Sequence, residues 1–219
     1  MSSKIEELFI RQQKIGIEFS KQNSNNLYNS AVLLAANQFY SPAIPILVLS
    51  AEEIIKSFAL CLQIFLGNES EVKKIIKTSI IKENDSYMNN HLVKHKLASA
   101  IIIDLNKISP VINFIKLLPI GEFKNILNVI SIPDTERTKI DSLLNELKVF
   151  NTKKNKGFYV DNKGNSWHTP LELTDQDYNK VLQTVNLLRD IFLPKIEQIQ
   201  NFSDSELASI YEITKDLQL

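Results

Sequence analysis

Residues 42–66 decide the fold: they read PAIPILVLSAEEIIKSFALCLQIFL and form the most apolar stretch of the chain. A proline suits the first turn of a helix, and the Gly-Asn pair that follows residue 66 is a typical helix end. Because the stretch is apolar on nearly all sides, other helices have to cover it. Glu52, Glu53 and Lys56 lie near its middle, where each charge would cost on the order of 3 kcal/mol in lipid. We therefore expect a central core helix and no membrane span.

The composition favours a single α-helical domain over residues 1–219. Of the 219 residues, 44% are hydrophobic, which is enough for one substantial core. The chain has only 5 glycines and 7 prolines, too few for the many tight turns of an all-β fold. Its 25 basic and 25 acidic residues give no net charge, so the protein is not built to coat nucleic acid or an anionic membrane.

Cysteine content and the first residues indicate the cellular compartment. The single cysteine excludes a disulfide framework and a cysteine-based metal cage. Residues 1–20 carry charges at helical spacing and contain no uninterrupted apolar run, so they do not have the pattern of a signal peptide. We therefore expect a cytoplasmic location.

Apolar periodicity predicts two helices before the central one. A stripe at helical spacing, typical of an amphipathic helix over residues 3–22, consists of Ile5, Leu8, Phe9, Gln12, Ile15 and Phe19. The polar residues 22–26 predict a turn, with Asn25 or Asn26 as the cap of a second helix over 27–39.

After the central helix we expect further helices and one insertion. Thr174 with Asp177, and Ser203 with Glu206, have the spacing of capping boxes at the starts of the last two helices. An Asn-Lys-Gly turn sequence at 162–164 predicts a small hairpin or an ordered loop. The other helices are expected near 69–82, 87–108, 111–130 (broken, or two short ones) and 134–150. The fold class is therefore all-α, a multi-helix bundle with one inserted loop or small hairpin near 151–170.

Three charged side chains within the apolar helix are the first candidates for a site. Glu52 and Lys56 are four residues apart and can form an ion pair on an exposed edge of the helix. Alternatively, Glu52, Glu53 and Lys56 persist in a core helix because they meet partners from another element. Those partners are either structural or line a functional groove, and the sequence leaves both open.

A pair of histidines is the second candidate. His91 and His95 share a helix face, together with the basic residues Lys94 and Lys96. A stable zinc site needs a third or fourth ligand, so we expect no metal and interpret this face as a solvated basic one. The glycines are too scattered for a phosphate loop or a dinucleotide fingerprint, so we expect no cofactor.

The inserted segment is the third candidate. Lysines at 153, 154 and 156 precede Phe158 and Tyr159, and cations beside aromatic rings can hold phosphate and stack a base. A lysine run before a hairpin is, however, more often a solvated turn. Trp167 follows, and a lone tryptophan usually anchors a loop to the core.

Three of these stretches, in this order, resemble one known family. Residues 50–56, SAEEIIK, are similar to a Glu-Glu-x-x-Lys helix, and His91–Leu97 is similar to a helix that bears His and Lys. Gly157–Asp161, followed by a Trp-x-x-Pro motif at 167–170, is similar to a Tyr-Val-Asp loop. On these residues the chain resembles the AbiV family of bacterial abortive-infection proteins, grouped with the HEPN-like helical domains. The resemblance spans about residues 31–175 and implies an all-α HEPN-type core, a homodimer, and a protein that arrests infected cells to block phage multiplication.

The resemblance also bears on ribonuclease chemistry. Many HEPN relatives are ribonucleases in which an Arg-x(4–6)-His motif supplies a phosphate-binding arginine and a proton-shuttling histidine. Here none of Arg11, Arg137 and Arg189 has a histidine at the required distance. Lys163 and His168 have that spacing, but lysine lacks the fork geometry of arginine. The standard HEPN ribonuclease motif is therefore missing.

Two hypotheses of different classes follow. In the first, the protein is a defence effector that acts by binding, and its partners are a second copy, a phage-encoded protein as trigger, and RNA or ribosome-associated factors of translation. Its functional groove would be lined by Glu52, Glu53, Lys56, His91, His95, Lys96, Lys156, Tyr159 and Asp161. In the alternative, it is a divergent metal-independent ribonuclease, with His91, His95 or His168 as general base and Lys96 or Lys156 on the phosphate. A purely structural helical adaptor is the third possibility.

Overall fold

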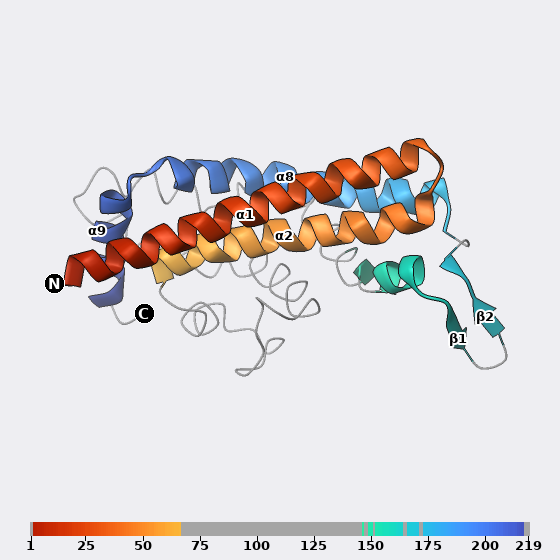
Figure 1. Ribbon diagram of the computed structural model, residues 1–219, viewed down its shortest axis with the longest axis horizontal. Coiled ribbons are helices and arrows are strands. Elements are labelled where there is room, and N and C mark those ends of the chain that lie inside the picture. Colours follow the sequence, from red (N-terminus) through yellow and green to blue (C-terminus); the bar gives the residue numbers. More distant parts are fainter. Residues whose placement is uncertain are drawn as a thin grey trace.

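Three long helices form the body of the protein (Figure 1). The computed structural model describes residues 2–66, 146, 149–150, 152–163, 166–170 and 173–216. Helices α1 (Ser2–Ala36), α2 (Tyr40–Leu66) and α8 (Asp175–Asn201) lie side by side, and α9 (Asp204–Asp216) lies at the end where α1 begins. A small hairpin of β1 (Asp161–Lys163) and β2 (Ser166–His168) lies at the opposite end. The predicted all-α class, with a small hairpin inserted, is confirmed.

Helix α2 is the central helix, as its apolar sequence predicts. It packs against both α1 and α8, and also against α9. Ile44, Leu47 and Ile54 are fully buried along it. The centroid of the Phe58 ring lies 4.7 Å from that of Phe192 on α8. Since full burial of a side chain of this size contributes about 1.5–3 kcal/mol, this ring pair is a main element of the core.

Hydroxyl groups join α1 to α2 where the two helices cross close together. Ser24 Oγ donates to the Ser50 carbonyl at 2.9 Å, and Ser50 Oγ lies at the same distance from the Ser24 carbonyl. Ser57 Oγ donates to the carbonyl of Ile17 at 3.1 Å. All three serines are buried, and a buried hydroxyl left without a partner would cost about 1–3 kcal/mol. The contact is therefore held by specific polar pairs as well as by apolar packing.

Helix α1 is continuous, which corrects the predicted turn at 22–26. Ser24, within this stretch, bonds to Ser50 of α2, and Asn25 accepts a 2.7 Å hydrogen bond from Arg189 Nη2 of α8. Neither Asn25 nor Asn26 caps a helix, because both lie inside α1. The polar side chains that suggested a turn are used for contacts between helices, and these contacts outweigh the weak helix propensity of Ser and Asn.

The buried face of α1 is also not the predicted stripe. Ile10 and Ile17 face the core, and the small residues Ser20, Ser24 and Ala31 continue their row. Of the stripe, only Phe9 packs inward, with its ring centroid 5.4 Å from that of Tyr211 on α9. The other apolar members of the stripe are exposed: Ile5, Leu8, Ile15 and Phe19. Close approach of α2 selects the row with small side chains rather than the row with more apolar ones.

The last two helices begin at the predicted capping boxes. Thr174 Oγ1 accepts from the Asp177 backbone N–H at 3.3 Å, and the Thr174 N–H donates to Asp177 Oδ2 at 3.2 Å. At α9, the Ser203 N–H donates to Glu206 Oε2 at 2.6 Å, and Ser203 Oγ accepts from the Glu206 N–H at 3.2 Å. Both boxes satisfy backbone donors that a helix N-terminus leaves unpaired. These two predicted helix starts are confirmed.

The insertion contains a helical turn as well as the hairpin. Residues 152–158 are helical, which corrects the prediction of a wholly non-helical segment. The strands then pair antiparallel, with Asp161 opposite His168 and Asn162 opposite Trp167. The small hairpin predicted from the turn sequence at 162–164 is therefore confirmed, with β1 beginning at Asp161.

No helix among the described residues is both long and apolar enough to cross a membrane. A single domain over residues 1–219 stays a prediction.

Candidate functional site

A buried ion pair connects the central helix to the inserted segment. Lys154 Nζ donates to Glu52 Oε1 at 2.9 Å, and the exposed fractions of the two side chains are 10% and 1%. Glu52 thus meets a partner from another element, as one of the two sequence interpretations requires. Desolvating two charges is costly, so the pair is weak support for stability by itself. Its consequence is positional: the charge on Glu52 holds the 152–158 turn against α2.

The other two charges of the central helix pair with each other. Lys56 Nζ lies 3.5 Å from Glu53 Oε2, one helical turn away on the same helix. Of the two interpretations that the sequence left open, the structure therefore matches the one in which Glu52 meets a partner from another element, since Glu52 bonds to Lys154 and Lys56 bonds to Glu53. Lys56 keeps 28% of its side chain exposed, so its ion pair is partly solvated and contributes little.

Backbone contact fixes the same segment at a second point. A Cβ on Gly157 would lie 2.5 Å from both Pro45 Cδ and the Ser41 carbonyl oxygen. No side chain other than hydrogen fits there, so Gly157 permits the close approach of the segment to the first turns of α2. The Ser41 hydroxyl also donates to the carbonyl of Pro170, on the far side of the hairpin. Ser41 thus contacts the insertion both before and after β1 and β2.

An exposed apolar surface directly follows Gly157 in the sequence. Phe158, Tyr159 and Val160, here called the Phe158–Val160 surface, have exposed fractions of 43%, 65% and 59%. The Phe158 and Tyr159 rings meet edge to face, with centroids 6.2 Å apart. Lys156 is exposed beside them. Three consecutive large apolar side chains held in solvent by a fixed backbone are typical of an interaction site.

The remaining lysine of the run is a structural partner. Lys153 Nζ lies 3.1 Å from Glu146 Oε2, and the lysine side chain is 18% exposed. Of the three lysines that the sequence offered as a phosphate-binding run, two are therefore engaged by carboxylates. Lys156 remains as the exposed lysine of this run.

Not all the predicted site residues fall within the described part of the chain. His91, His95 and Lys96 lie outside it, so a groove lined by all nine residues stays a prediction. Asp161 is in β1, directly opposite His168 in β2. Tyr159 and Lys156 are exposed to solvent, whereas Glu52 is buried in the core. The structure therefore joins Glu52 to the Tyr159 segment through Lys154, a residue that sequence reasoning assigned to a solvated turn.

A second polar cluster, between α1 and α8, was missed by sequence reasoning. Arg189 Cζ lies 4.4 Å from the centre of the Tyr28 ring, and Arg189 Nη2 donates to Asn25 Oδ1 at 2.7 Å. The Tyr28 hydroxyl donates to Asn186 Oδ1 at 2.9 Å. Burial lowers the pKa of the Arg189 guanidinium, although arginine stays charged at neutral pH. Only the spacing of Asn25 and Tyr28 by three residues hinted that they share a face.

The described residues are arranged to hold an exposed surface in place rather than to carry out acid–base chemistry. No three His, Cys, Asp or Glu side chains of this part of the chain gather as metal ligands. Burial raises the pKa of the Cys61 thiol well above its usual range, so this cysteine is an inert core residue rather than a nucleophile. The arrangement is therefore suited to presenting a surface to a partner.

One of three comparisons with known proteins finds a match. A family model described as AbiV, of the HEPN group, matches residues 12–189. This range includes all of α2, the Glu52–Lys154 pair and the Phe158–Val160 surface. Neither a curated protein nor a solved structure matches the chain.

Proposed function

Because the chain belongs to the AbiV family of HEPN-like abortive-infection proteins, we propose that it arrests infected bacterial cells by binding a partner protein through the Phe158–Val160 surface. The partner is a phage-encoded protein or a component of the translation machinery, and the encounter takes place in the cytoplasm. Binding, rather than cleavage, is the mechanism.

The observation that carries this proposal is an exposed aromatic segment on a rigid support. Phe158 and Tyr159 project from a backbone that is fixed by the Glu52–Lys154 pair and by Gly157 against Pro45. A preorganised surface loses little conformational entropy on binding, and tyrosine and phenylalanine are enriched at protein interfaces. A protein partner is favoured over RNA, because Lys156 is the only exposed lysine among the described residues 152–160 and RNA binding relies on several phosphate contacts.

The test combines phage protection with capture of the partner. Cells that carry the wild-type protein, Tyr159→Ser or Leu33→Ser are infected with phage, and plaque formation is counted. Leu33 is the matched control, because its exposed fraction of 67% on α1 is close to that of Tyr159. We expect Tyr159→Ser to lose protection and to capture at least about tenfold less of the partner from infected cells, and Leu33→Ser to behave like the wild type.

RNA integrity distinguishes the alternative function. Total RNA and tRNA are incubated with the purified protein, with and without lysate of infected cells. Intact RNA together with halted protein synthesis supports binding. Specific cleavage that is lost in His95→Ala or His168→Ala would establish the ribonuclease instead. Full protection by Tyr159→Ser would remove the Phe158–Val160 surface from the mechanism.

A further inference from the structure

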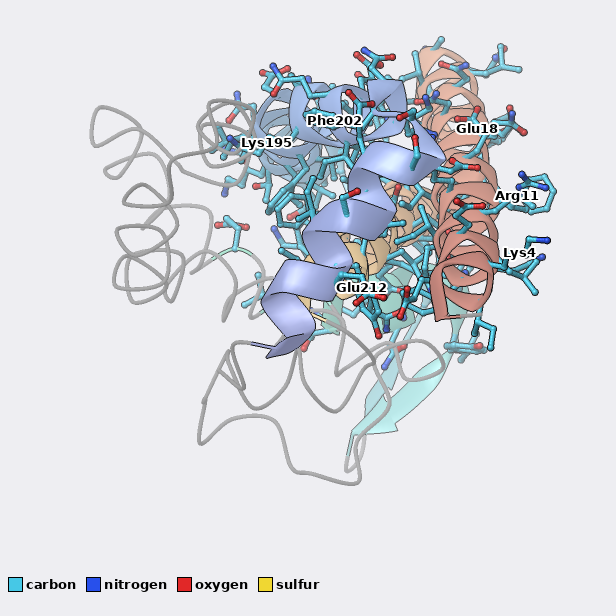
Figure 2. All side chains as sticks on the ribbon, turned by 90° about the vertical axis from the view of Figure 1, so that its left-hand side faces the viewer. Lys4, Arg11, Glu18, Lys195, Phe202 and Glu212 are labelled. Atoms are coloured by element: carbon cyan, nitrogen blue, oxygen red, sulfur yellow. The ribbon has the colours of Figure 1, made fainter. Side chains whose placement is uncertain are left out.

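The polar cluster between α1 and α8 is made by two residues from each helix. Asn25 and Tyr28 of α1 contact Arg189 and Asn186 of α8. Figure 2 looks at the molecule from the end where α1 begins and shows these two helices next to each other, with α9 in front. Within each helix the two residues are three positions apart, so they are neighbours on one helix face. The four side chains therefore form one group across the contact of the two helices.

The hydrogen bonds inside this cluster use the oxygen atoms of both amides. Arg189 Nη2 donates to Asn25 Oδ1 at 2.7 Å, and the Tyr28 hydroxyl donates to Asn186 Oδ1 at 2.9 Å. A guanidinium can only donate, so the oxygen of the Asn25 amide has to face it. Neither Nδ2 group donates to another residue within the described part of the chain. Each amide therefore keeps two N–H donors for a further partner.

Arg189 adds a third donor group and a positive charge. Its Nη1 is buried and makes no hydrogen bond within the residues that the structure describes. Asp190, the next residue in the chain, acts on the charge only through space. By contrast, the charge of Lys21, one turn before Asn25, is paired with Glu18 Oε2 at 3.1 Å. A buried N–H without an acceptor is rare in folded proteins, and an ion is one of the partners that explain it.

We propose that Asn25, Asn186 and Arg189 bind a phosphate group between α1 and α8, carried by free phosphate or by a small phosphate monoester. The groups that these residues offer are all donors, and one of them is charged, which suits an oxyanion and not a metal ion. A carboxylate prefers both arms of one guanidinium fork, but Nη2 is already bonded to Asn25. Phosphate oxygens point in several directions and can accept from donors on two helices.

Binding at this cluster needs a change of side-chain conformation only. Arg189 Nη1 is buried, but Arg189 as a whole is partly exposed, as are Asn25 and Asn186. Changes of rotamer at a binding site are common. Because the bound phosphate joins donors of α1 and α8, it stabilises the folded chain. These residues belong to other elements than the Phe158–Val160 surface, so the inference does not rest on the proposed function.

Thermal unfolding provides the first test. The melting temperature of the full chain is measured in about 10 mM sodium phosphate and in sodium chloride of equal ionic strength. For a dissociation constant on the order of 1 mM, we expect phosphate to raise the melting temperature by about 3–6 °C relative to chloride. Sodium acetate should raise it by less than half as much. Equal melting temperatures in phosphate and chloride, or an equal rise in acetate, would overturn the proposal.

Two matched variants test the residues. Asn186→Asp keeps an oxygen for the Tyr28 hydroxyl and replaces Nδ2 by a negative charge. We expect this variant to stay folded, because the new carboxylate is one turn from Arg189, and to show a phosphate-induced rise below about 1 °C. Asn179→Asp makes the same change at an exposed position two turns earlier on α8 and should keep the full rise. An undiminished rise in Asn186→Asp would place the binding elsewhere and overturn the site.

The arginine side chains give a direct measurement of binding. The chain has three arginines, so their Nε–H signals in NMR spectra are few, and the Arg189→Lys variant identifies the signal of Arg189. Titration with phosphate should shift this signal, with half-saturation at about 1 mM. The signal of Arg11, which is 67% exposed and contacts Asp204, should change little. An Arg189 signal that stays in place up to about 20 mM phosphate contradicts the proposed contact.

Further probes identify the source of the phosphate group. Glycerol 2-phosphate that binds at least as tightly as free phosphate supports a small phosphate monoester as the ligand, and weaker binding supports free phosphate. A short single-stranded RNA is the third probe. If it bound at least about tenfold more tightly than both, and lost this affinity in Asn186→Asp, the cluster would be a contact for a nucleic-acid backbone, and the small-ligand proposal would be overturned.

Discussion

Lys154 donates a 2.9 Å hydrogen bond to Glu52 across 102 positions of sequence, and it does so inside the core. This contact makes the inserted segment part of the scaffold, so that Tyr159, five residues further on, projects from a fixed base. The pair is therefore the link between the stability of the central helix and the placement of the exposed surface.

Removing the cation should destabilise the protein strongly. Lys154→Met leaves the Glu52 carboxylate buried without this counter-charge, and we expect the free energy of unfolding to fall by about 3–5 kcal/mol. Lys56→Met is the control, since Lys56 is partly solvated and its pair with Glu53 measures 3.5 Å. For this control we expect a loss below about 1 kcal/mol. Urea unfolding measures both, and equal losses would show that burial of the pair has no special effect.

A methyl group at position 157 should loosen the insertion. In Gly157→Ala the new Cβ meets the Ser41 carbonyl and Pro45, which are backbone and ring atoms that cannot move aside cheaply. We expect a loss of about 1–3 kcal/mol in thermal unfolding, together with reduced phage protection. Gly16→Ala is the matched change, because its Cβ would meet only the flexible end of Leu60 at 3.1 Å. If Gly157→Ala unfolded at the same temperature as the wild type, this would contradict the close approach of Gly157 to Ser41 and Pro45.

The stacked arginine between α1 and α8 should not tolerate lysine. Arg189→Lys keeps the charge but loses the planar contact with Tyr28 and the hydrogen bond to Asn25, so we expect a loss of about 1–2 kcal/mol. Tyr28→Phe retains the ring and removes only the bond to Asn186, and it should cost about 1 kcal/mol or less. Chemical unfolding of the two variants separates the stacking contact from the hydroxyl.

Acid should weaken the junction of α8 and α9 through Asp204. The hydrogen bond from Lys14, followed by the attraction of that charge, holds the pKa of Asp204 below its usual value. A carboxyl whose pKa is lower in the folded state stabilises the protein above its unfolded pKa of about 3.9, and this contribution disappears as the pH falls through the folded pKa.

The corresponding measurement is a pair of melting curves across acid pH. Near pH 6 we expect Asp204→Asn to be less stable by about 0.5–1 kcal/mol, a small value because the pair is partly exposed. The difference from the wild type should disappear as the pH falls through the folded pKa of Asp204, because the wild-type carboxyl is then protonated and the side chain of the Asp204→Asn variant carries no charge at any pH. A difference that persists unchanged in acid would show that Asp204 acts through its shape rather than through its charge.

The parts of the fold that were predictable from sequence are those encoded locally. The central helix follows from an apolar run, and the starts of α8 and α9 follow from Thr174 and Ser203 with acidic residues three positions on. The course of α1 was not predictable in this way. Its polar residues 22–26 look like a turn until their partners on α2 and α8 are known, because those partners are distant in sequence.

The same distinction applies to the candidate site: some of its features follow from the local sequence, and others depend on how distant segments pack. The need of Glu52 for a partner follows from placing a carboxylate in an apolar helix, which is a local observation. The identity of that partner does not, because Lys153, Lys154 and Lys156 look alike in sequence and only the packing of the 152–158 turn selects one of them. Tyr159 was predicted from its motif, whereas its exposure depends on how the neighbouring turn is held.

The reciprocal bonds between Ser24 and Ser50 also limit how the two longest N-terminal helices can move. Sliding one helix past the other by a single turn, about 5.4 Å, would break both bonds at once and bury two hydroxyls beside apolar neighbours. Apolar packing alone would oppose such a shift less, because apolar contacts are not directional and can re-form after the shift. The serine pair therefore opposes sliding of α1 along α2 more strongly than it opposes a small change in the angle between the two helices.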